Sequence, residues 1–160
     1  MTDRVISINS EKDMAVLGEY IGRRLGGGEI IELIGGLGAG KTTLTKAILK
    51  GAGVAGGFSP TFILDATYQT KTASPRQIHH LDLYRLKNEQ ELVTLGVYDY
   101  IGNKNVSLIV EWADRFPISL EAGKLIIRIE GKTDDKRTLH ISATDKKHAA
   151  LIDGRGLNIA

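Results

Sequence analysis

Residues 35–42 carry the pattern that points most directly to chemistry in this chain. They read Gly-Gly-Leu-Gly-Ala-Gly-Lys-Thr, in which a glycine is followed by four residues and then by Gly-Lys-Thr. This spacing is typical of a phosphate-binding loop, where glycines let backbone N–H groups turn toward a polyphosphate without Cβ clashes. In such a loop the ammonium of Lys41 reaches the β- and γ-phosphates, and the hydroxyl of Thr42 binds Mg²⁺. We therefore expect a site for a magnesium–nucleoside triphosphate.

Two acidic residues could complete phosphoryl chemistry, which needs a second anchor for the metal and a group that positions the attacking water. Glu111 directly follows the apolar run over 106–110, and Asp82 ends a more polar run that begins at Ile78. We expect Glu111 to hold the metal, directly or through water, and Asp82 to order the attacking water or a metal-bound water. The alternative is that both are ordinary carboxylates, one at a sheet edge and one on a hairpin surface.

Three further features leave alternatives open. The Ser-Pro-Thr-Phe segment at 59–62 would let Thr61 reach a γ-phosphate as part of a nucleotide-sensing loop, or it is a plain X-Pro turn. Arg85 would stabilise phosphate charge or pair with a nearby glutamate. Trp112, the single tryptophan, would line the nucleotide site or pack in the core.

The elements around the loop must hold it between a strand and a helix. Residues 30–34, Ile-Ile-Glu-Leu-Ile, are typical of a buried strand, and residues 41–50 predict a helix with Gly51 as its C-cap. The positive end of that helix dipole would then face the phosphates. A strand is also expected over 5–8, followed by a helix that Ser10 caps.

The rest of the chain predicts two hairpins around a central strand. Residues 63–68 pair with 78–84 in the first hairpin, and the alternating segments 124–130 and 137–143 form the second. Residues 106–110 suit a central parallel strand. Helices are expected from Asn88 to about Ile101 and from Lys146. Together these elements predict a three-layer, P-loop NTPase-like α/β domain with a mixed central sheet and added β-hairpins, which binds nucleotide at the carboxyl ends of its strands.

Length and composition narrow the class of protein. A chain of 160 residues predicts a single domain over 1–160, and the lack of cysteine excludes disulfides and thiolate metal sites. The net charge of +2 is too small to argue for direct nucleic-acid binding. No apolar run approaches the roughly 20 residues of a membrane span. We expect a cytoplasmic protein without membrane contact.

Four motifs in a fixed order resemble a known family over roughly residues 8–130. They are the phosphate loop with Thr43, Ser-Pro-Thr-Phe at 59–62, His-Leu-Asp-Leu-Tyr-Arg at 80–85 and Val-Glu-Trp at 110–112. The chain closely resembles the TsaE family (older name YjeE) of small bacterial ATPases. Two departures are Gly36, where the family often has a polar residue, and Ala113-Asp114, which replaces the commoner Pro-Glu.

The resemblance implies a role in making threonylcarbamoyladenosine beside the anticodon of tRNA. Family members bind ATP or ADP with Mg²⁺, hydrolyse ATP slowly on their own, and act with the TsaD–TsaB heterodimer, so that tRNA is contacted only through that complex. The resemblance also implies a catalytic role for Lys41, Asp82 and Glu111, with Thr42 and Glu111 at the metal. The implied nucleotide contacts are Asn9 and Ser10 near adenine, Gly36, Leu37, Gly38, Ala39, Gly40, Lys41, Thr42 and Thr43 in the loop, and Thr61.

Two other functions fit the phosphate loop alone. A small-molecule kinase would use the same loop, but such kinases usually add an arginine-rich lid, and Arg76, Arg85, Arg115 and Arg128 are scattered. A nucleotide-sensing module without catalysis would hold ATP only to set a docking surface.

Overall fold

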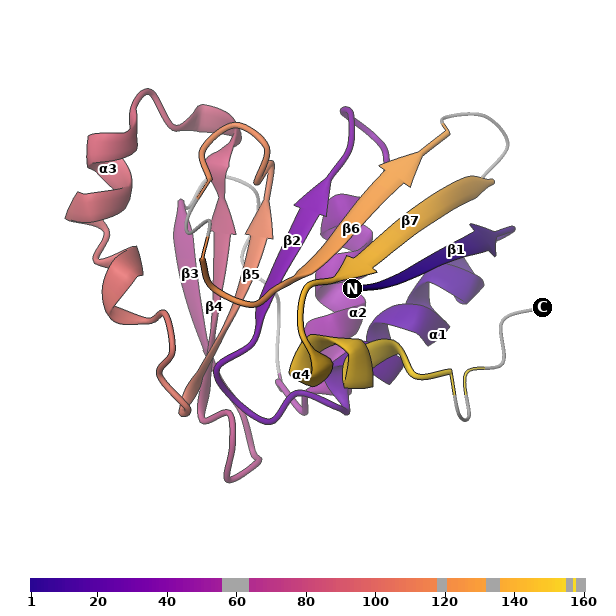
Figure 1. Cartoon of the computed structure of the whole chain (residues 1–160), viewed down its shortest axis with the longest axis horizontal. Coiled ribbons are helices and arrows are strands. Elements are labelled where there is room, and N and C mark those ends of the chain that lie inside the picture. The colour runs from indigo at the N-terminus through magenta and orange to yellow at the C-terminus, as the bar shows by residue number, and fades with distance from the viewer. Residues whose placement is uncertain (56–63, 118–120, 132–135, 155–156, 158–160) are drawn as a thin grey trace.

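A single mixed sheet organises the molecule (Figure 1). The computed structural model describes residues 1–55, 64–117, 121–131, 136–154 and 157. Within these residues the sheet has seven strands in the order β1-β7-β6-β2-β5-β4-β3. The strands are β1 (Thr2–Ile8), β2 (Ile30–Ile34), β3 (Asp65–Gln69), β4 (Gln77–Asp82), β5 (Val106–Glu111), β6 (Leu125–Glu130) and β7 (Arg137–Ala143).

The centre of the sheet is parallel and its edges are antiparallel. Strand β5 pairs parallel with β4 and β2, and β2 pairs parallel with β6. Every residue of β5 is buried, as expected of a central parallel strand. Strand β3 pairs antiparallel with β4 at one edge, while β7 and β1 extend the other edge beyond β6. The predicted mixed sheet with added hairpins is therefore confirmed.

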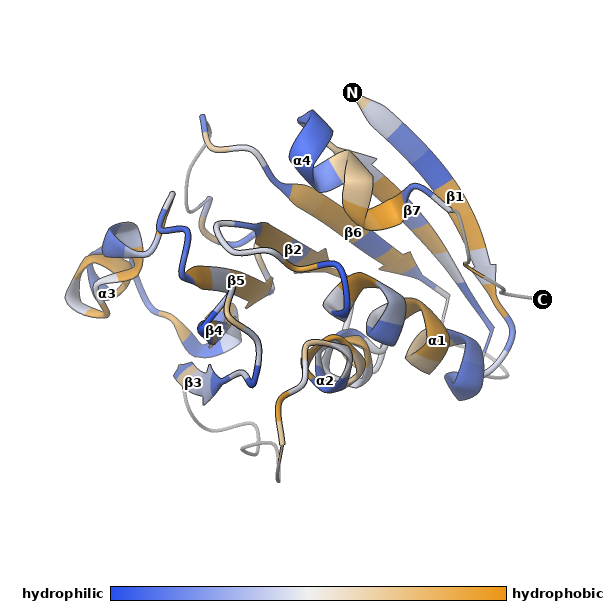
Figure 2. Ribbon diagram, turned by 90° about the horizontal axis from the view of Figure 1, so that it is seen from below, coloured by the Kyte–Doolittle hydropathy of each residue, from blue (hydrophilic) through white to orange (hydrophobic). Residues whose placement is uncertain are grey.

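Helices α1 (Glu11–Gly22) and α2 (Lys41–Gly51) lie side by side against one face of the sheet (Figure 2). Ser10 caps α1 as predicted, because its Oγ accepts a 3.1 Å hydrogen bond from the N–H of Asp13. The predicted cap at Gly51 is wrong, since Ala52 is the C-cap of α2. Gly51 instead permits close helix packing: a Cβ there would lie 2.3 Å from the carbonyl oxygen of Glu19 in α1.

Hydrophobic side chains form a core on each face of the sheet. The larger core lies between the sheet and the α1–α2 pair, and it includes Leu33 of β2, Ile127 of β6 and Ile48 of α2. The smaller core lies on the opposite face, where Leu81 of β4 and Leu108 of β5 pack with residues of the segment that follows β4. Helices or turns on both faces give the predicted three layers, and the second helical layer is the smaller.

That smaller layer departs from the predicted helix over Asn88 to Ile101. Asn88 does cap a helix, α3, but α3 covers only Glu89–Thr94. Gly96 adopts a left-handed φ of 71°, which ends the helical path and starts a separate 3₁₀ turn, η2 (Val97–Asp99). The break lets Val97 enter the smaller core, where it is fully buried.

Two other boundaries bear on the site and the tail. The strand predicted to reach residue 84 ends at Asp82, where a 3₁₀ turn, η1 (Leu83–Arg85), begins. The short helix predicted from Lys146 is present as α4 (Lys146–Ala149), and η3 (Ala150–Ile152) follows it. No helix in the described part of the chain is long and apolar enough to cross a bilayer.

Candidate active site

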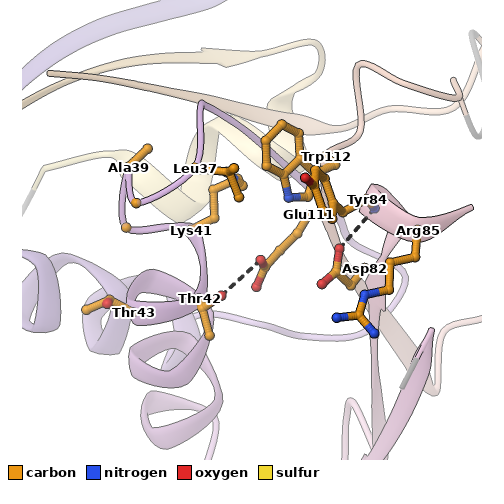
Figure 3. Close-up of a pocket in the computed structure, with 12 residues that line it drawn as sticks. Leu37, Ala39, Lys41, Thr42, Thr43, Asp82, Tyr84, Arg85, Glu111 and Trp112 are labelled. Atoms are coloured by element: carbon orange, nitrogen blue, oxygen red, sulfur yellow. Dashed lines mark hydrogen bonds between the residues drawn. The ribbon is translucent and has the colours of Figure 1, made fainter. Parts of the chain in front are cut away.

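A cavity of about 470 Å³ opens where β2, β4 and β5 end and α2 begins (Figure 3). It lies at the carboxyl ends of parallel strands, the usual place for a ligand in an open α/β sheet. The lining residues are Leu37, Gly38, Ala39, Gly40, Lys41, Thr42, Thr43, Asp82, Tyr84, Arg85, Glu111 and Trp112. Most of the predicted loop residues, Lys41, and both predicted carboxylates therefore meet in one cavity.

The loop between β2 and α2 has the backbone that its glycines allow. Gly38 and Gly40 have φ angles of 73° and 110°, which other residue types rarely adopt. Helix α2 starts directly after Gly40, so its first turn presents N–H groups and the positive end of the helix dipole to the cavity. Gly36, also predicted to contact nucleotide, is not among the lining residues; its carbonyl oxygen accepts a hydrogen bond from Lys41.

The ammonium of Lys41 is held at the entrance of the loop. Its Nζ donates to the carbonyl oxygens of Gly35 at 2.6 Å and Gly36 at 2.8 Å. It also lies 3.9 Å from the centre of the Trp112 ring, within cation–π range. Lys41 is only 5% exposed, so its charge stands in a partly desolvated site where it acts strongly on an anion.

Glu111 is buried and fixed by hydrogen bonds from three side chains. The Thr42 hydroxyl donates to Oε2 at 3.1 Å, and the Thr45 hydroxyl donates to Oε1 at 2.9 Å. Nε2 of His80 lies 2.9 Å from the same Oε1. Burial acts to raise the pKa of the Glu111 carboxyl, but the hydrogen bonds and the charge of His80 outweigh burial and lower the pKa. Glu111 is therefore ionised at neutral pH, as a metal ligand must be.

Asp82 lies next to Glu111 in the sheet. The two residues are register partners across the parallel pair β4 and β5, so both side chains project from the same face. Asp82 also accepts a 3.0 Å hydrogen bond at Oδ1 from the N–H of Tyr84, which closes the η1 turn and fixes the carboxylate at the cavity wall (Figure 3). Asp82 thus lies at the cavity wall beside Glu111, as predicted, and its part in catalysis stays a prediction.

Trp112 has a left-handed backbone conformation, which is unusual for a residue other than glycine. Its φ is 59°, the one positive value among the described residues other than glycine. A hydrogen bond of 3.0 Å from its N–H to the Leu33 carbonyl holds that backbone. Its ring packs against Tyr84 with centroids 4.8 Å apart, and the two aromatic rings form one wall of the cavity. Trp112 lines the cavity and also packs, partly buried, against the smaller core, so the structure shows both kinds of contact considered for it.

The residues predicted near adenine occupy the other side of the loop. Ser10 lines a second cavity of about 100 Å³ together with Gly40, Thr43 and Arg137. The Ser10 hydroxyl already accepts the capping bond of α1. Asn9 is exposed and does not line this cavity; its N–H donates to Oδ2 of Asp13. Thr61 lies outside the described residues.

Sequence reasoning missed three residues at this site. His80 and Thr45 hold Glu111, and Arg137 contacts the loop from β7. A signal for His80 existed, because residues two apart on a strand share a face and Asp82 was already placed there. No local signal marks Arg137, which lies 98 residues along the chain from Ala39, its loop partner.

Together these groups suit a magnesium-bound polyphosphate. The loop and helix offer N–H groups and an ammonium for phosphate oxygens. A hydroxyl and an ionised carboxylate 3.1 Å apart, on Thr42 and Glu111, form the oxygen donor set that Mg²⁺ prefers. Asp82 adds a second carboxylate facing the same space.

Comparison with known proteins connects the chain to one family model. The model described as "Threonylcarbamoyl adenosine biosynthesis protein TsaE" matches residues 8–139. Proteins named tRNA threonylcarbamoyladenosine biosynthesis protein TsaE from Haemophilus influenzae and Rickettsia conorii are 36% and 33% identical. These alignments cover 71% and 92% of this chain and 70% and 84% of the relatives. The crystal structure of Bacillus subtilis YdiB matches with a TM-score of 0.77 at 25% identity, over 98% of this chain and 97% of that one.

Proposed function

The chain belongs to the TsaE family of threonylcarbamoyladenosine biosynthesis proteins, and we propose that it serves this tRNA modification as a magnesium-dependent ATPase. In this proposal the protein binds ATP at the loop over 35–42, hydrolyses it slowly alone, and is stimulated by the TsaD–TsaB complex. It does not itself transfer the threonylcarbamoyl group, and it meets tRNA only through that complex.

One observation carries the proposal. The Lys41 ammonium, the Thr42 hydroxyl and the Glu111 carboxylate converge on a single cavity at the start of α2. The first two come from the loop and the third from the end of a neighbouring parallel strand. Burying an ionised carboxylate costs free energy, so its position beside this loop is expected for a binding site and not for a glycine turn with only a structural role.

The donor set fits magnesium. Thr42 and Glu111 would hold the ion, which when bound would neutralise charge on the β- and γ-phosphates of ATP. Without the ion, the Thr42 hydroxyl donates a hydrogen bond to Glu111, so the two ligands are already side by side. His80 and Thr45 keep the carboxylate in that orientation.

The remaining groups suit hydrolysis. The Lys41 ammonium, which now donates to loop carbonyls, would donate to phosphate oxygens when ATP binds. These hydrogen bonds would be stronger, because phosphate oxygens carry more negative charge than carbonyl oxygens. Asp82 faces the same cavity and accepts the Tyr84 N–H at Oδ1, so its carboxylate could accept a proton from an attacking water. Because the cavity is open to bulk water, we expect slow turnover by the isolated protein.

A partner is supported by the rim of the cavity. Leu37 is 64% exposed at the tip of the loop and Tyr84 is 42% exposed on the facing turn. Apolar side chains at the mouth of a site mark a surface that another protein can cover. Covering the mouth would exclude bulk water and strengthen the electrostatic interactions inside, which would raise the rate of hydrolysis.

The test is ATP turnover and tRNA modification with and without TsaD–TsaB. Phosphate release should be slow for the protein alone and faster with the complex, and modification should proceed over many cycles only when ATP is hydrolysed. Lys41→Ala should stop multi-cycle modification, whereas Lys46→Ala, an exposed lysine on the same helix, should not. Appearance of the γ-phosphate on a small molecule would instead indicate a kinase, and full modification with Lys41→Ala would contradict the proposal.

A further inference from the structure

Arg137 connects β7, the last strand along the chain, to the middle of the phosphate loop. It is the first residue of β7, and its Nε donates to the carbonyl oxygen of Ala39 at 2.9 Å. Its Nη2 donates to the carbonyl oxygen of Gly38 at 3.3 Å, and its Nη1 donates to the carbonyl oxygen of Lys136 at 2.8 Å. Each nitrogen of the guanidinium thus has a backbone carbonyl as partner.

These bonds set the direction of the loop peptides. In a trans peptide unit the C=O and the N–H point in opposite directions, so fixing one fixes the other. Arg137 draws the carbonyl of Ala39 toward β7, which turns the N–H of Gly40 away from β7. The adjacent N–H of Ala39 bonds to the Gly36 carbonyl at 3.2 Å, so the loop has a defined internal turn.

Two cations therefore hold different parts of the loop, Lys41 its start and Arg137 its middle. Lys41 binds the carbonyls of Gly35 and Gly36, and Arg137 binds those of Gly38 and Ala39. Lys41 can exchange its carbonyl partners for phosphate oxygens because it lines the large cavity. Arg137 does not line that cavity; it borders the smaller one on the other side of the loop and a further cavity of about 410 Å³ between the ends of β1, β6 and β7. Its contacts can persist while phosphate is bound.

We propose that Arg137 is a positioning residue for the phosphate loop, which acts by orienting the Gly38 and Ala39 peptides before nucleotide arrives. This inference rests on the proposed function, because an oriented loop matters only if the loop binds phosphate. The planar guanidinium suits the role: it presents parallel donors to two neighbouring carbonyls, which a lysine ammonium cannot do with the same geometry.

The strand pairing explains how a residue so distant in sequence reaches the loop. Arg137 is the register partner of Ile8, the last residue of β1, and α1 begins shortly after. The start of α1 borders the smaller cavity through Ser10 and Met14. The β1–β7 pair therefore brings Arg137 to the side of the loop that faces α1.

The first test needs no nucleotide. In the ligand-free protein, Arg137→Ala should speed amide hydrogen exchange at Gly40 and broaden the NMR signals of Gly38 and Ala39, while the central strands stay protected. Arg137→Lys should give an intermediate change and guards against a failure of the alanine variant to fold. Arg128→Ala, an exposed arginine on the neighbouring strand β6, is the matched control and should leave the loop signals unchanged.

The second test measures binding by calorimetry with ATP, inorganic tripolyphosphate and adenosine. Arg137→Ala should weaken ATP and tripolyphosphate binding about tenfold, as expected from disordering a preorganised anion site, with adenosine unchanged. An equal loss for adenosine would overturn the proposal in favour of a direct base contact. Unchanged tripolyphosphate affinity with a lower melting temperature would overturn it in favour of a purely structural role. If the wild-type protein bound no ATP, the proposed function would fail, while the loop measurement would still decide whether Arg137 orders the peptides.

Discussion

Nε2 of His80 lies 2.9 Å from Oε1 of Glu111, across the neighbouring parallel strands β4 and β5. Together with the hydroxyls of Thr42 and Thr45, this contact holds a buried carboxylate in one orientation. The carboxylate keeps its charge because these donors outweigh the effect of burial on its pKa. A fixed, charged oxygen beside the Thr42 hydroxyl is what a magnesium site at this position requires.

Replacing Glu111 by glutamine should therefore separate metal binding from nucleotide binding. Glutamine keeps the shape but removes the charge that attracts Mg²⁺. We expect Mg²⁺ to lose its effect on ATP affinity, and phosphate release to fall about 100-fold. Calorimetric titrations of ATP with Mg²⁺ and with EDTA measure the first effect. Glu130→Gln, at the exposed end of β6, is the control, and a retained magnesium effect in Glu111→Gln would remove Glu111 from the metal site.

Replacing Asp82 by asparagine should slow hydrolysis without weakening binding. Asparagine can still accept the hydrogen bond from the Tyr84 N–H, so the η1 turn should survive, but it cannot take a proton from water. We expect phosphate release to fall about 100-fold and ATP affinity to change less than about twofold. Asp114→Asn, an exposed aspartate beyond the site, should behave as wild type. A large loss of ATP affinity in Asp82→Asn would instead make Asp82 a metal ligand.

The parts of the fold that were predictable from sequence depend on local signals. The glycine spacing and the apolar run over 30–34 identified the loop and β2, which has those bounds in the structure. Ser10 was predicted as a cap because its hydroxyl needs only a partner three residues away. Asp82 and Glu111 were singled out because each ends a strand-like run, and the likeness of four separated motifs to one family implied the same roles for them.

The parts that were missed depend on tertiary structure. The helix predicted to reach Ile101 ends before Gly96, whose left-handed backbone turns the chain so that Val97 packs in the smaller core. The contact of Arg137 with Ala39 follows from the pairing of β1 with β7, which no local pattern specifies. His80 was given no role of its own, although its spacing from Asp82 placed both on one face of β4.

The single tryptophan should report phosphate binding. Nζ of Lys41 lies 3.9 Å from the centre of the Trp112 ring, and a phosphate in the loop should draw the ammonium toward its oxygens. Loss of this cation from the ring should change the intensity of Trp112 emission. Titration with inorganic tripolyphosphate should give a saturable change, and adenosine should give none. An unchanged intensity of Trp112 emission at a saturating concentration of tripolyphosphate would contradict this placement of the ammonium.

Acid should destabilise the protein in part through Glu29, at the end of the sheet opposite the site. Burial acts to raise the pKa of this carboxyl, but hydrogen bonds from the Ser107 hydroxyl and the Gly26 N–H, with the charge of Lys147, lower it below the ordinary value of 4.5. A carboxyl with a lowered pKa in the folded state stabilises the fold above its ordinary pKa, and this stabilisation is lost as the pH falls through the folded value.

Glu29→Gln should therefore lower the free energy of unfolding by about 2 kcal/mol near neutral pH, because glutamine cannot accept all of these hydrogen bonds. The difference in the free energy of unfolding should shrink as the pH falls below about 4.5, where protonation of Glu29 in the wild type begins to remove the stabilisation by its carboxylate. Urea unfolding at several pH values measures it. Glu121→Gln, an exposed glutamate, should show no such difference, and a pH-independent gap for Glu29→Gln would refute the assignment.

The central claim is that a triphosphate binds at the loop between β2 and α2 through main-chain N–H groups and the Lys41 ammonium. Calorimetric titration of Mg·ATP into wild type, Lys41→Ala and Lys46→Ala tests it most directly. The account predicts saturable binding to wild type and to Lys46→Ala, with affinity at least about 100-fold weaker for Lys41→Ala. No heat of binding to wild type, or equal affinity for Lys41→Ala, would contradict the account.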